Sequence, residues 1–447
     1  MAVIVLAVLC AFPAAAQNGG GQAPSPDAAP PGKLTLHEAL KRALEVNEQV
    51  ERSHEEIGVA KANQSYLFSQ IMPRINLTGA TTRNSKEVSF GSGADARTIL
   101  PGFNWNYSFV LAQPVYAGNR ERRAYDQAKI GVLNAEEGVR GTEDAVLLRV
   151  ASNYLAIVDA DRSIDVENRN ISLAQKRREQ ATAFYQAGET TKVDVLRAET
   201  AIKAAQRALA VAQQARATAE GRLRADLNLE GPVDVADPGH VLPPLPDEPT
   251  LVNRAQSTRP DITTASNNVR SASLEVQKQR GFWLPVVTFN AGYINQKTAF
   301  PAPRYGFATF NFNVPLFQSG EVQARVAGAK ERELQARSEL DEARISARED
   351  VHRAMIDLQS ADTSLSLAKE QLAAADAEYT QSFELYRAQE ATSLDVSTSE
   401  QSLAEARRAV ANETLNHDLA ELRVWYAAGA LKEAVGVTAT NMSGATR

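Results

Sequence analysis

The stretch FYQAGETTKVDVLRAE, residues 184–199, occurs a second time in related form as LYRAQEATSLDVSTSE, residues 385–400. When the two copies are aligned at a fixed offset, Asp194 meets Asp395. Each copy lies between long alanine-rich segments with helical periodicity, which predicts a tight turn between two helices. Because a repeated turn implies a repeated hairpin around it, the sequence predicts two homologous halves.

Composition narrows the classes of function. The chain has 447 residues and a formal net charge of −6, which argues against a nucleic-acid partner. No run of about 18 apolar residues follows the N-terminus, so no membrane-spanning helix is expected. The five histidines have no ligand spacing, and no nucleophile or phosphate-loop motif occurs. We therefore expect no enzyme, no cofactor and no metal site.

The N-terminus has the pattern of an export signal. Residues 1–16 combine an apolar core with a small-residue cleavage site and are expected to be removed. Cys10, the only cysteine, follows Leu9 rather than a small residue, which favours a place in the signal over a lipid anchor. The core lacks a preceding basic residue, so a start further upstream stays open, as does lipidation. Residues 17–33 are rich in Gly, Pro and Ala and are expected to be a disordered leader.

The first repeat is expected to span residues 34–230. Its predicted elements are a short helix, strands at about 75–83 and 103–113, and a long helical hairpin at 117–228. The polar, glycine-rich residues 83–102 are expected to form a loop, and Pro114 is expected to end the second strand.

Alternation of aromatic and polar residues is clearest in the second strand. This pattern is typical of a strand with lipid on one side and water on the other. A soluble two-sided strand is the alternative. The residues expected to face lipid in the four strands are Phe103, Trp105, Tyr107, Phe109, Phe289, Tyr293, Phe310 and Phe312.

The pattern then restarts in the second half. Residues 231–249 are rich in proline and are expected to link the halves. The second repeat, residues 250–430, is predicted to contain a short helix, strands at about 286–295 and 305–314, and a hairpin at 318–428. Residues 431–447 are expected to be a C-terminal tail.

The element lengths predict an assembly. The proline-free stretch from about 117 to 186 is on the order of 100 Å long if continuously helical, which is typical of coiled-coil-like helices. Four strands cannot close a barrel, and open edges are not tolerated in lipid. A homotrimer with twelve strands is preferred to a dimer, whose eight strands would leave an interior filled by side chains.

At this point the sequence resembles the TolC-like outer-membrane efflux proteins. The resemblance covers residues 34 to about 426 and rests on motifs repeated in order. They are the turns 188–195 and 389–396, the strand exits Pro114, Tyr116, Gly118 and Pro315, Phe317, Gly320, the pairs Met72-Pro73 and Leu284-Pro285, and Arg259-Pro260-Asp261. The resemblance implies an α+β membrane protein that forms a trimeric channel-tunnel. In it, a 12-stranded transmembrane β-barrel continues into a long α-helical periplasmic barrel.

The resemblance also implies a gate at the repeated turns. Asp194 and Tyr386 would link the two turns, and Asp395 would contribute to an acidic ring at the constriction. Two positions depart from the family: Ala391 stands where a linking Arg is expected, and Thr398 stands where a second ring Asp is expected.

Two questions about this gate stay open. Lys192 or Arg387 could replace the missing Arg. A purely structural role for Asp194 and Asp395, as helix N-caps or turn residues, is the alternative to gating.

The function implied is an exit duct in the outer membrane. It would pass drugs or other small molecules from an inner-membrane pump and a periplasmic adaptor, in contact with outer-membrane lipid. The alternatives are a type I protein secretion channel and a structural periplasmic coiled coil. The turn residues expected to contact the adaptor are Gly188, Glu189, Thr190, Gln389, Glu390 and Ala391.

Overall fold

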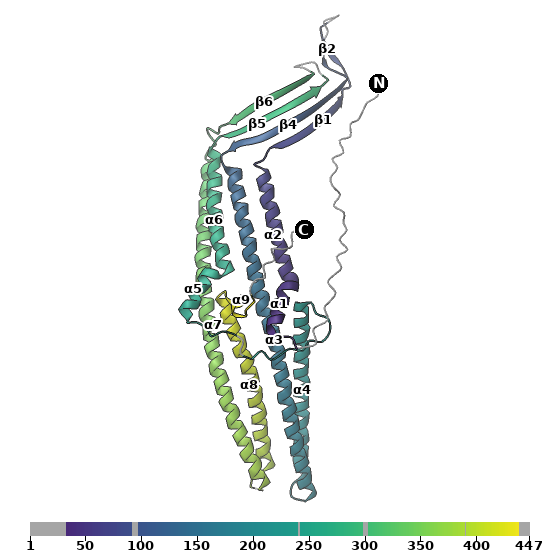
Figure 1. The fold of residues 1–447 in the computed structure, drawn as a ribbon, viewed down its shortest axis with the longest axis vertical. Helices are drawn as coiled ribbons and strands as arrows, with labels where there is room; N and C mark the ends of the chain where they lie inside the picture. The colour runs from purple at the N-terminus through teal and green to yellow at the C-terminus, as the bar shows by residue number, and fades with distance from the viewer. Residues whose placement is uncertain (1–32, 92–96, 240–241, 298–302, 389, 438–447) are drawn as a thin grey trace.

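The computed structural model describes residues 33–91, 97–239, 242–297, 303–388 and 390–437. The described chain is long and narrow, with a β-sheet at one end and helical hairpins that run to the other (Figure 1). The signal peptide, with Cys10, and most of the expected leader lie outside these residues. Among the described residues, no helix combines the length and apolar character needed to cross a membrane.

The two halves repeat each other closely, which confirms the predicted duplication. Helices α3 (Arg120–Gln186) and α7 (Glu321–Arg387) are each 67 residues long, and α7 begins and ends 201 positions after α3. The return helices α4 (Lys192–Leu227) and α8 (Ser393–Ala427) begin at the same offset. The duplicated turns of the sequence therefore lie at the tips of two equivalent hairpins (Figure 1).

Shorter helices precede each strand pair. They are α1 (Leu36–Val46), α2 (Glu48–Ser69), α5 (Glu248–Thr258), α6 (Pro260–Arg280) and the 3₁₀ turn η2 (Gly281–Trp283). Thr35 and Glu38 form a capping box at the start of α1. Asn47 separates α1 from α2 and caps α2 through its side chain, because its backbone is extended rather than helical.

The main sheet has four antiparallel strands in the order β1-β4-β5-β6. They are β1 (Arg74–Arg83), β4 (Phe103–Ala117), β5 (Val286–Gln296) and β6 (Arg304–Asn313). In this sheet β1 and β6 each have one neighbour, so both are edge strands.

Two expectations for the first strand pair are wrong. Pro114 does not end its strand, because β4 continues to Ala117 past an irregularity between Pro114 and Tyr116. Proline is tolerated there because pairing with β1 extends only to Ala112, so no ladder bond to β1 is lost. The expected loop also contains a small hairpin, β2 (Val88–Phe90) and β3 (Arg97–Leu100).

The strand registers place the predicted aromatic residues on one face of the sheet. Phe109 pairs with Leu77 on one side and with Tyr293 on the other, and Phe289 pairs with Phe310. Directly opposite residues share a face and side chains alternate along a strand, so all eight aromatics lie together. The intervening residues, including Thr78 and Ser108, whose hydroxyls are hydrogen-bonded at 2.6 Å, lie on the other face.

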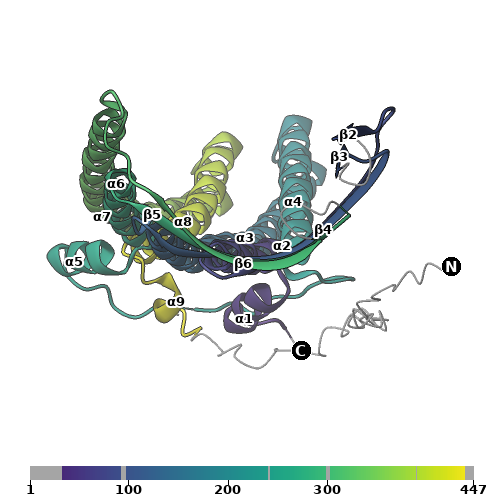
Figure 2. The same ribbon diagram turned by 90° about the horizontal axis from the view of Figure 1, so that it is seen from above.

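The helices follow the order of the strands. Below the sheet, α2 packs on α3, α3 on α6, and α6 on α7, so α2 lies beneath β1 and α7 beneath β6 (Figure 1). Nearer the tips the order is α4, α3, α8, α7. Seen from above, the strands and helices follow one curved band (Figure 2). One chain is therefore a segment of a curved wall with two free edges.

The main core lies midway along the helices, where the short helices pack on the long ones. Tyr154 of α3 is fully buried and donates its hydroxyl hydrogen to the carbonyl oxygens of Leu34 and Ala236, at 2.8 and 2.7 Å. The expected C-terminal tail is partly wrong: α9 (Leu431–Ala434) forms there, and Leu431 and Val437 are buried in this core. The tail prediction did not take into account these apolar side chains, whose burial fixes the segment against the core.

Candidate functional site: the paired turns

The two turns repeat the same backbone hydrogen bond. The Glu189 amide donates to the Phe184 carbonyl at 2.8 Å, and the Glu390 amide donates to the Leu385 carbonyl at 2.9 Å. Gly188 has φ +78°, a left-handed conformation that glycine adopts at no steric cost and that commonly ends a helix. Its counterpart Gln389 lies outside the described residues.

The return helices begin at threonines, so neither aspartate occupies the N-cap position itself, although each accepts hydrogen bonds within its own turn. Thr191 is the N-cap of α4 and Thr392 that of α8, so Asp194 and Asp395 each occupy the third helical position. Thr392 and Asp395 form a reciprocal capping box, with the Thr392 amide donating to the carboxylate at 2.8 Å. Asp395 therefore still supports the helix start, although Thr392 caps it.

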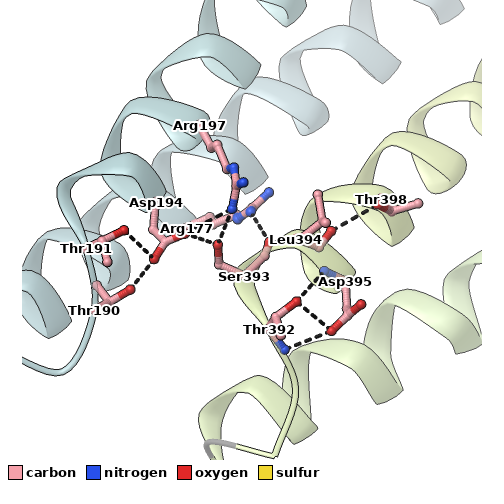
Figure 3. A network of polar contacts seen from close by, with 10 residues as sticks. All are labelled: Arg177, Thr190, Thr191, Asp194, Arg197, Thr392, Ser393, Leu394, Asp395 and Thr398. Atoms are coloured by element: carbon pink, nitrogen blue, oxygen red, sulfur yellow. Dashed lines mark hydrogen bonds and ion pairs between the residues drawn. The ribbon is translucent and has the colours of Figure 1, made fainter.

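Asp194 is the centre of a network that joins the two hairpins (Figure 3). Its carboxylate accepts hydrogen bonds from the hydroxyls of Thr190 in its own turn and Ser393 in the other. Arg197 Nη1 lies 3.3 Å from one carboxylate oxygen and 3.4 Å from the Ser393 hydroxyl oxygen. Burial disfavours the charged carboxylate, but these hydrogen bonds and the Arg197 charge outweigh it, so the pKa of Asp194 lies below its usual value.

Arg177 of α3 adds a second connection to the same turn. It is 5% exposed and donates to the Ser393 carbonyl at 2.8 Å and to the Glu400 carboxylate at 2.5 Å. Arg177, Arg197, Ser393 and Glu400 were not among the predicted site residues. Arg197 follows Asp194 by three residues, and this helical spacing could have indicated their ion pair. No local pattern, however, indicates a contact such as that of Arg177 with Ser393, which are 216 positions apart.

Tyr386 lies beside this network without a hydrogen bond to Asp194 among the described residues. Its ring contacts Phe184 edge-on, with centroids 5.7 Å apart. Burial and the nearby negative charge of Asp194 raise the pKa of Tyr386. Both residues line an open cavity of about 450 Å³ between the turns, together with Thr190 and Ala391. The structure thus brings Asp194 and Tyr386 together, and Ser393 makes the direct link to the aspartate.

Asp395 is exposed in the single chain. Hydrogen bonds from Thr392 hold the pKa of Asp395 below its usual value, so the carboxylate is charged at neutral pH. Of the two candidate substitutes for the missing arginine, Arg387 pairs with Glu384 of its own helix at 3.4 Å. Lys192 is exposed at the start of α4. In the described structure, Arg177 and Arg197 are the cations that reach across to the second hairpin.

Groups of His, Cys, Asp and Glu suited to holding a metal ion do not occur in the part of the chain that the structure describes. The polar network at the turns connects helices of the two hairpins. Its components are hydrogen bonds and ion pairs that join two hairpins at their tips.

Comparison with known proteins identifies the family. The profile of the family described as "Outer membrane efflux protein" matches residues 39–229 and 251–430, one segment in each repeat. The chain is 24% identical over 370 residues to the outer membrane efflux protein BepC of Brucella suis, covering 81% of this chain and 78% of BepC.

Solved structures show the same fold. A crystal structure of CusC, described in terms of transmembrane channel formation, aligns with a TM-score of 0.78 at 17% identity and covers 88% of this chain and 92% of CusC. The open state of the MtrE outer membrane channel of Neisseria gonorrhoeae aligns with a TM-score of 0.75 at 18% identity, covering 90% of each chain. The chain therefore belongs to the outer membrane efflux protein family: it is a non-enzymatic, TolC-like outer-membrane channel protein that extends into the periplasm.

Proposed function

We propose that three copies of this chain form the exit duct of a tripartite export system, which passes drugs or other small molecules out of the cell. The observation that carries the proposal is that the free edges of the sheet and the free edges of the helical layer lie on the same two sides of the chain. The edge strands β1 and β6 lie directly beyond the edge helices α2 and α7. A single rotation that pairs β6 of one copy with β1 of the next copy therefore also brings α7 of the first copy against α2 of the next.

Three copies are the number that the geometry favours. Each chain contributes four strands to the main sheet, so three chains give a barrel of twelve. Closure removes the unpaired strand edges that lipid does not tolerate. The shared aromatic face of the sheet meets lipid, and the more polar face meets the lumen.

The paired turns form the periplasmic gate in this proposal. Asp194, Ser393 and Arg177 hold the two hairpins of each chain together, with Tyr386 packed beside them. Around the threefold axis, Asp395 of each copy contributes to an acidic ring, which concentrates cations at the constriction. The turn residues at positions 188–190 and 389–391 dock the periplasmic adaptor, and the inner-membrane pump supplies the energy.

Type I protein secretion is the competing role for the same architecture. A purely structural periplasmic coiled coil is excluded by membership in an outer-membrane channel family. Gene deletion separates the remaining two. Export of small molecules predicts that deleted cells accumulate a fluorescent efflux dye while their secreted proteins are unchanged. Loss of a secreted protein with unchanged dye accumulation would contradict the proposal.

A further inference from the structure

The contact between α3 and α8 differs from the other helix contacts below the core. Within the first hairpin, the buried residues of α4 are all apolar, among them Ala198, Ile202 and Ala205. The α3–α8 seam instead carries buried polar side chains. They are Glu167, Asn170, Arg177, Ser393 and Glu400. Buried polar groups thus join the two hairpins, beside an apolar contact of Leu173 with the cluster around Leu403.

Two ion pairs cross this seam at different heights. The lower pair joins Arg177 to Glu400 at 2.5 Å, with side chains 5% and 10% exposed. The upper pair joins Glu167 to Arg408 through two hydrogen bonds of 2.5 and 3.1 Å. The Glu167 side chain is 4% exposed, which makes it a buried carboxylate held in a two-pronged contact.

Asn170 extends the upper pair. Its amide donates to Glu167 at 3.3 Å, and its carbonyl oxygen accepts from Arg407 at 3.2 Å. Arg407 also lies 3.8 Å from Asp376 of α7, so both helices of the second hairpin are involved. The upper contact is thus a small network about three helical turns from the lower one.

The two pairs have opposite orientation. At the lower pair α3 carries the cation, and at the upper pair α3 carries the anion. Ten residues separate Glu167 from Arg177, or about 15 Å of helix. An axial slip of α8 that brought Glu400 to Glu167 would oppose two buried carboxylates. A slip of two to three turns is therefore opposed by like charges, and a shorter slip breaks both ion pairs.

Water can reach both pairs from one side. An open groove of about 660 Å³ lies between α4 and α8, and Asn170, Glu400 and Arg408 are among its lining residues. Sideways separation of the hairpins lets water hydrate the charges as they part. Axial slip offers no such compensation, because it brings like charges together.

We propose that Glu167–Arg408 and Arg177–Glu400 form a register latch, which returns α8 to one resting position on α3 after each opening of the gate. The upper pair is the new element, since it lies outside the turns and holds the hairpins together when the contacts of Asp194 are broken. This inference rests on the proposed function, because a latch has a role only in a protein that opens.

The test is charge reversal at the upper pair in the purified full-length channel, recorded in planar lipid bilayers. Glu167→Arg and Arg408→Glu should each increase the ratio of open to closed time by about tenfold or more, because each leaves two like charges in the seam. The double variant E167R/R408E should restore the wild-type ratio. Glu167→Gln, which keeps the shape of the side chain but removes its charge, should give a smaller increase in this ratio. It provides the test if the charge-reversal variants fail to assemble.

A matched control uses an ion pair of one helix. Glu333 and Arg337 of α7 form an i,i+4 pair at 2.6 Å, and swapping them should leave the open-time ratio unchanged. If the wild-type channel opens and closes but Glu167→Gln and both reversals leave the ratio of open to closed time unchanged, the latch is overturned and the proposed function as an exit duct still stands. A wild-type protein that assembles but conducts no ions would instead overturn the proposed function.

Discussion

Ser393, the first residue of α8, donates its hydroxyl hydrogen to the carboxylate of Asp194 near the start of α4. This bond connects the two duplicated turns directly, and the Ser393 carbonyl accepts from Arg177 as well. One serine is therefore held by both helices of the first hairpin. Its counterpart in the first turn is Lys192, so the duplication has diverged at the position that makes the connection.

Ser393→Ala should favour opening. The substitution removes a hydrogen bond to a charged acceptor, and the ratio of open to closed time should rise about tenfold, equivalent to about 1.4 kcal/mol. Single-channel recording measures this ratio. Thr398→Ala is the matched control, because the Thr398 hydroxyl donates to the Leu394 carbonyl of its own helix, at 3.0 Å. Equal ratios in Ser393→Ala and wild type would show that the bond does not hold the gate.

Asp395→Asn should abolish cation selectivity. The substitution removes the charge, while its amide oxygen can still accept from Thr392 at the helix start. The reversal potential in a salt gradient reports selectivity, and it should move towards zero. Thr392→Ala breaks the capping box but keeps the charge, so it should retain selectivity. A selective Asp395→Asn channel would place the acidic ring elsewhere.

Tyr386 tests whether ring packing or a hydroxyl link matters at the gate. The ring contacts Phe184, and no hydrogen bond to Asp194 occurs among the described residues. Tyr386→Ala should therefore raise the resting conductance by several fold, and Tyr386→Phe should raise it less. An equal rise in both variants, measured in bilayers at neutral pH, would show that the hydroxyl carries the whole effect.

Asp159 gives a pH-dependent prediction. Burial, with a smaller contribution from the Asp418 charge, raises the pKa of Asp159 to about 6, and its Oδ1 atom is buried without a hydrogen-bond partner among the described residues. Ionisation of Asp159 therefore destabilises the folded state. The destabilisation is complete above about pH 6, where the carboxyl is ionised in the folded protein, and it disappears towards pH 4.

Asp159→Asn should accordingly raise the melting temperature at pH 7.5 and lose this advantage near pH 4. The gain should be about 1 kcal/mol, because partial exposure reduces the penalty. Thermal unfolding at several pH values measures it, with Asp165→Asn, an exposed residue of the same helix, as the control. A gain that is independent of pH would exclude ionisation as the cause.

The aromatic face of the sheet predicts an asymmetric response to charge. Phe109→Arg should destabilise the folded barrel by about 2–4 kcal/mol, because it places a cation near the middle of β4 on the face that we propose to meet lipid. Asn106→Arg, on the opposite face of the same strand, should be tolerated. Urea titration of the heat-modifiable gel mobility compares the two. Equal destabilisation would mean that the faces are assigned wrongly.

Much of the fold could be predicted because it repeats local patterns. Alternation placed the four strands, and the proline-free stretch from about 117 to 186 placed the first long helix. The strand end predicted at Pro114 was wrong because a proline interrupts a strand only where its missing N–H is needed for pairing. That depends on how far the neighbouring strand β1 extends. The α9 segment was missed because its burial depends on distant core residues.

The site was less predictable than the fold for a similar reason. Asp194 and Tyr386 could be found because both belong to the repeated stretch. Arg177 and Ser393 could not, because their contact depends on the angle at which the two hairpins pack. A hairpin pattern specifies its own helices and contains little information on how it packs against the other.

Closure of the ring is the central claim, and disulfide formation between β1 and β6 tests it most directly. Cys10 is the only cysteine of the sequence, so pairs can be introduced along the two edges, starting with Arg74→Cys and Asn313→Cys, where antiparallel pairing brings the strand ends together. Oxidation in outer membranes should give covalent species up to three times the chain mass of 48.4 kDa, and single-cysteine variants should not. Absence of cross-linked chains at every register tried, or a ladder that continues beyond three chains, would contradict the closed trimer.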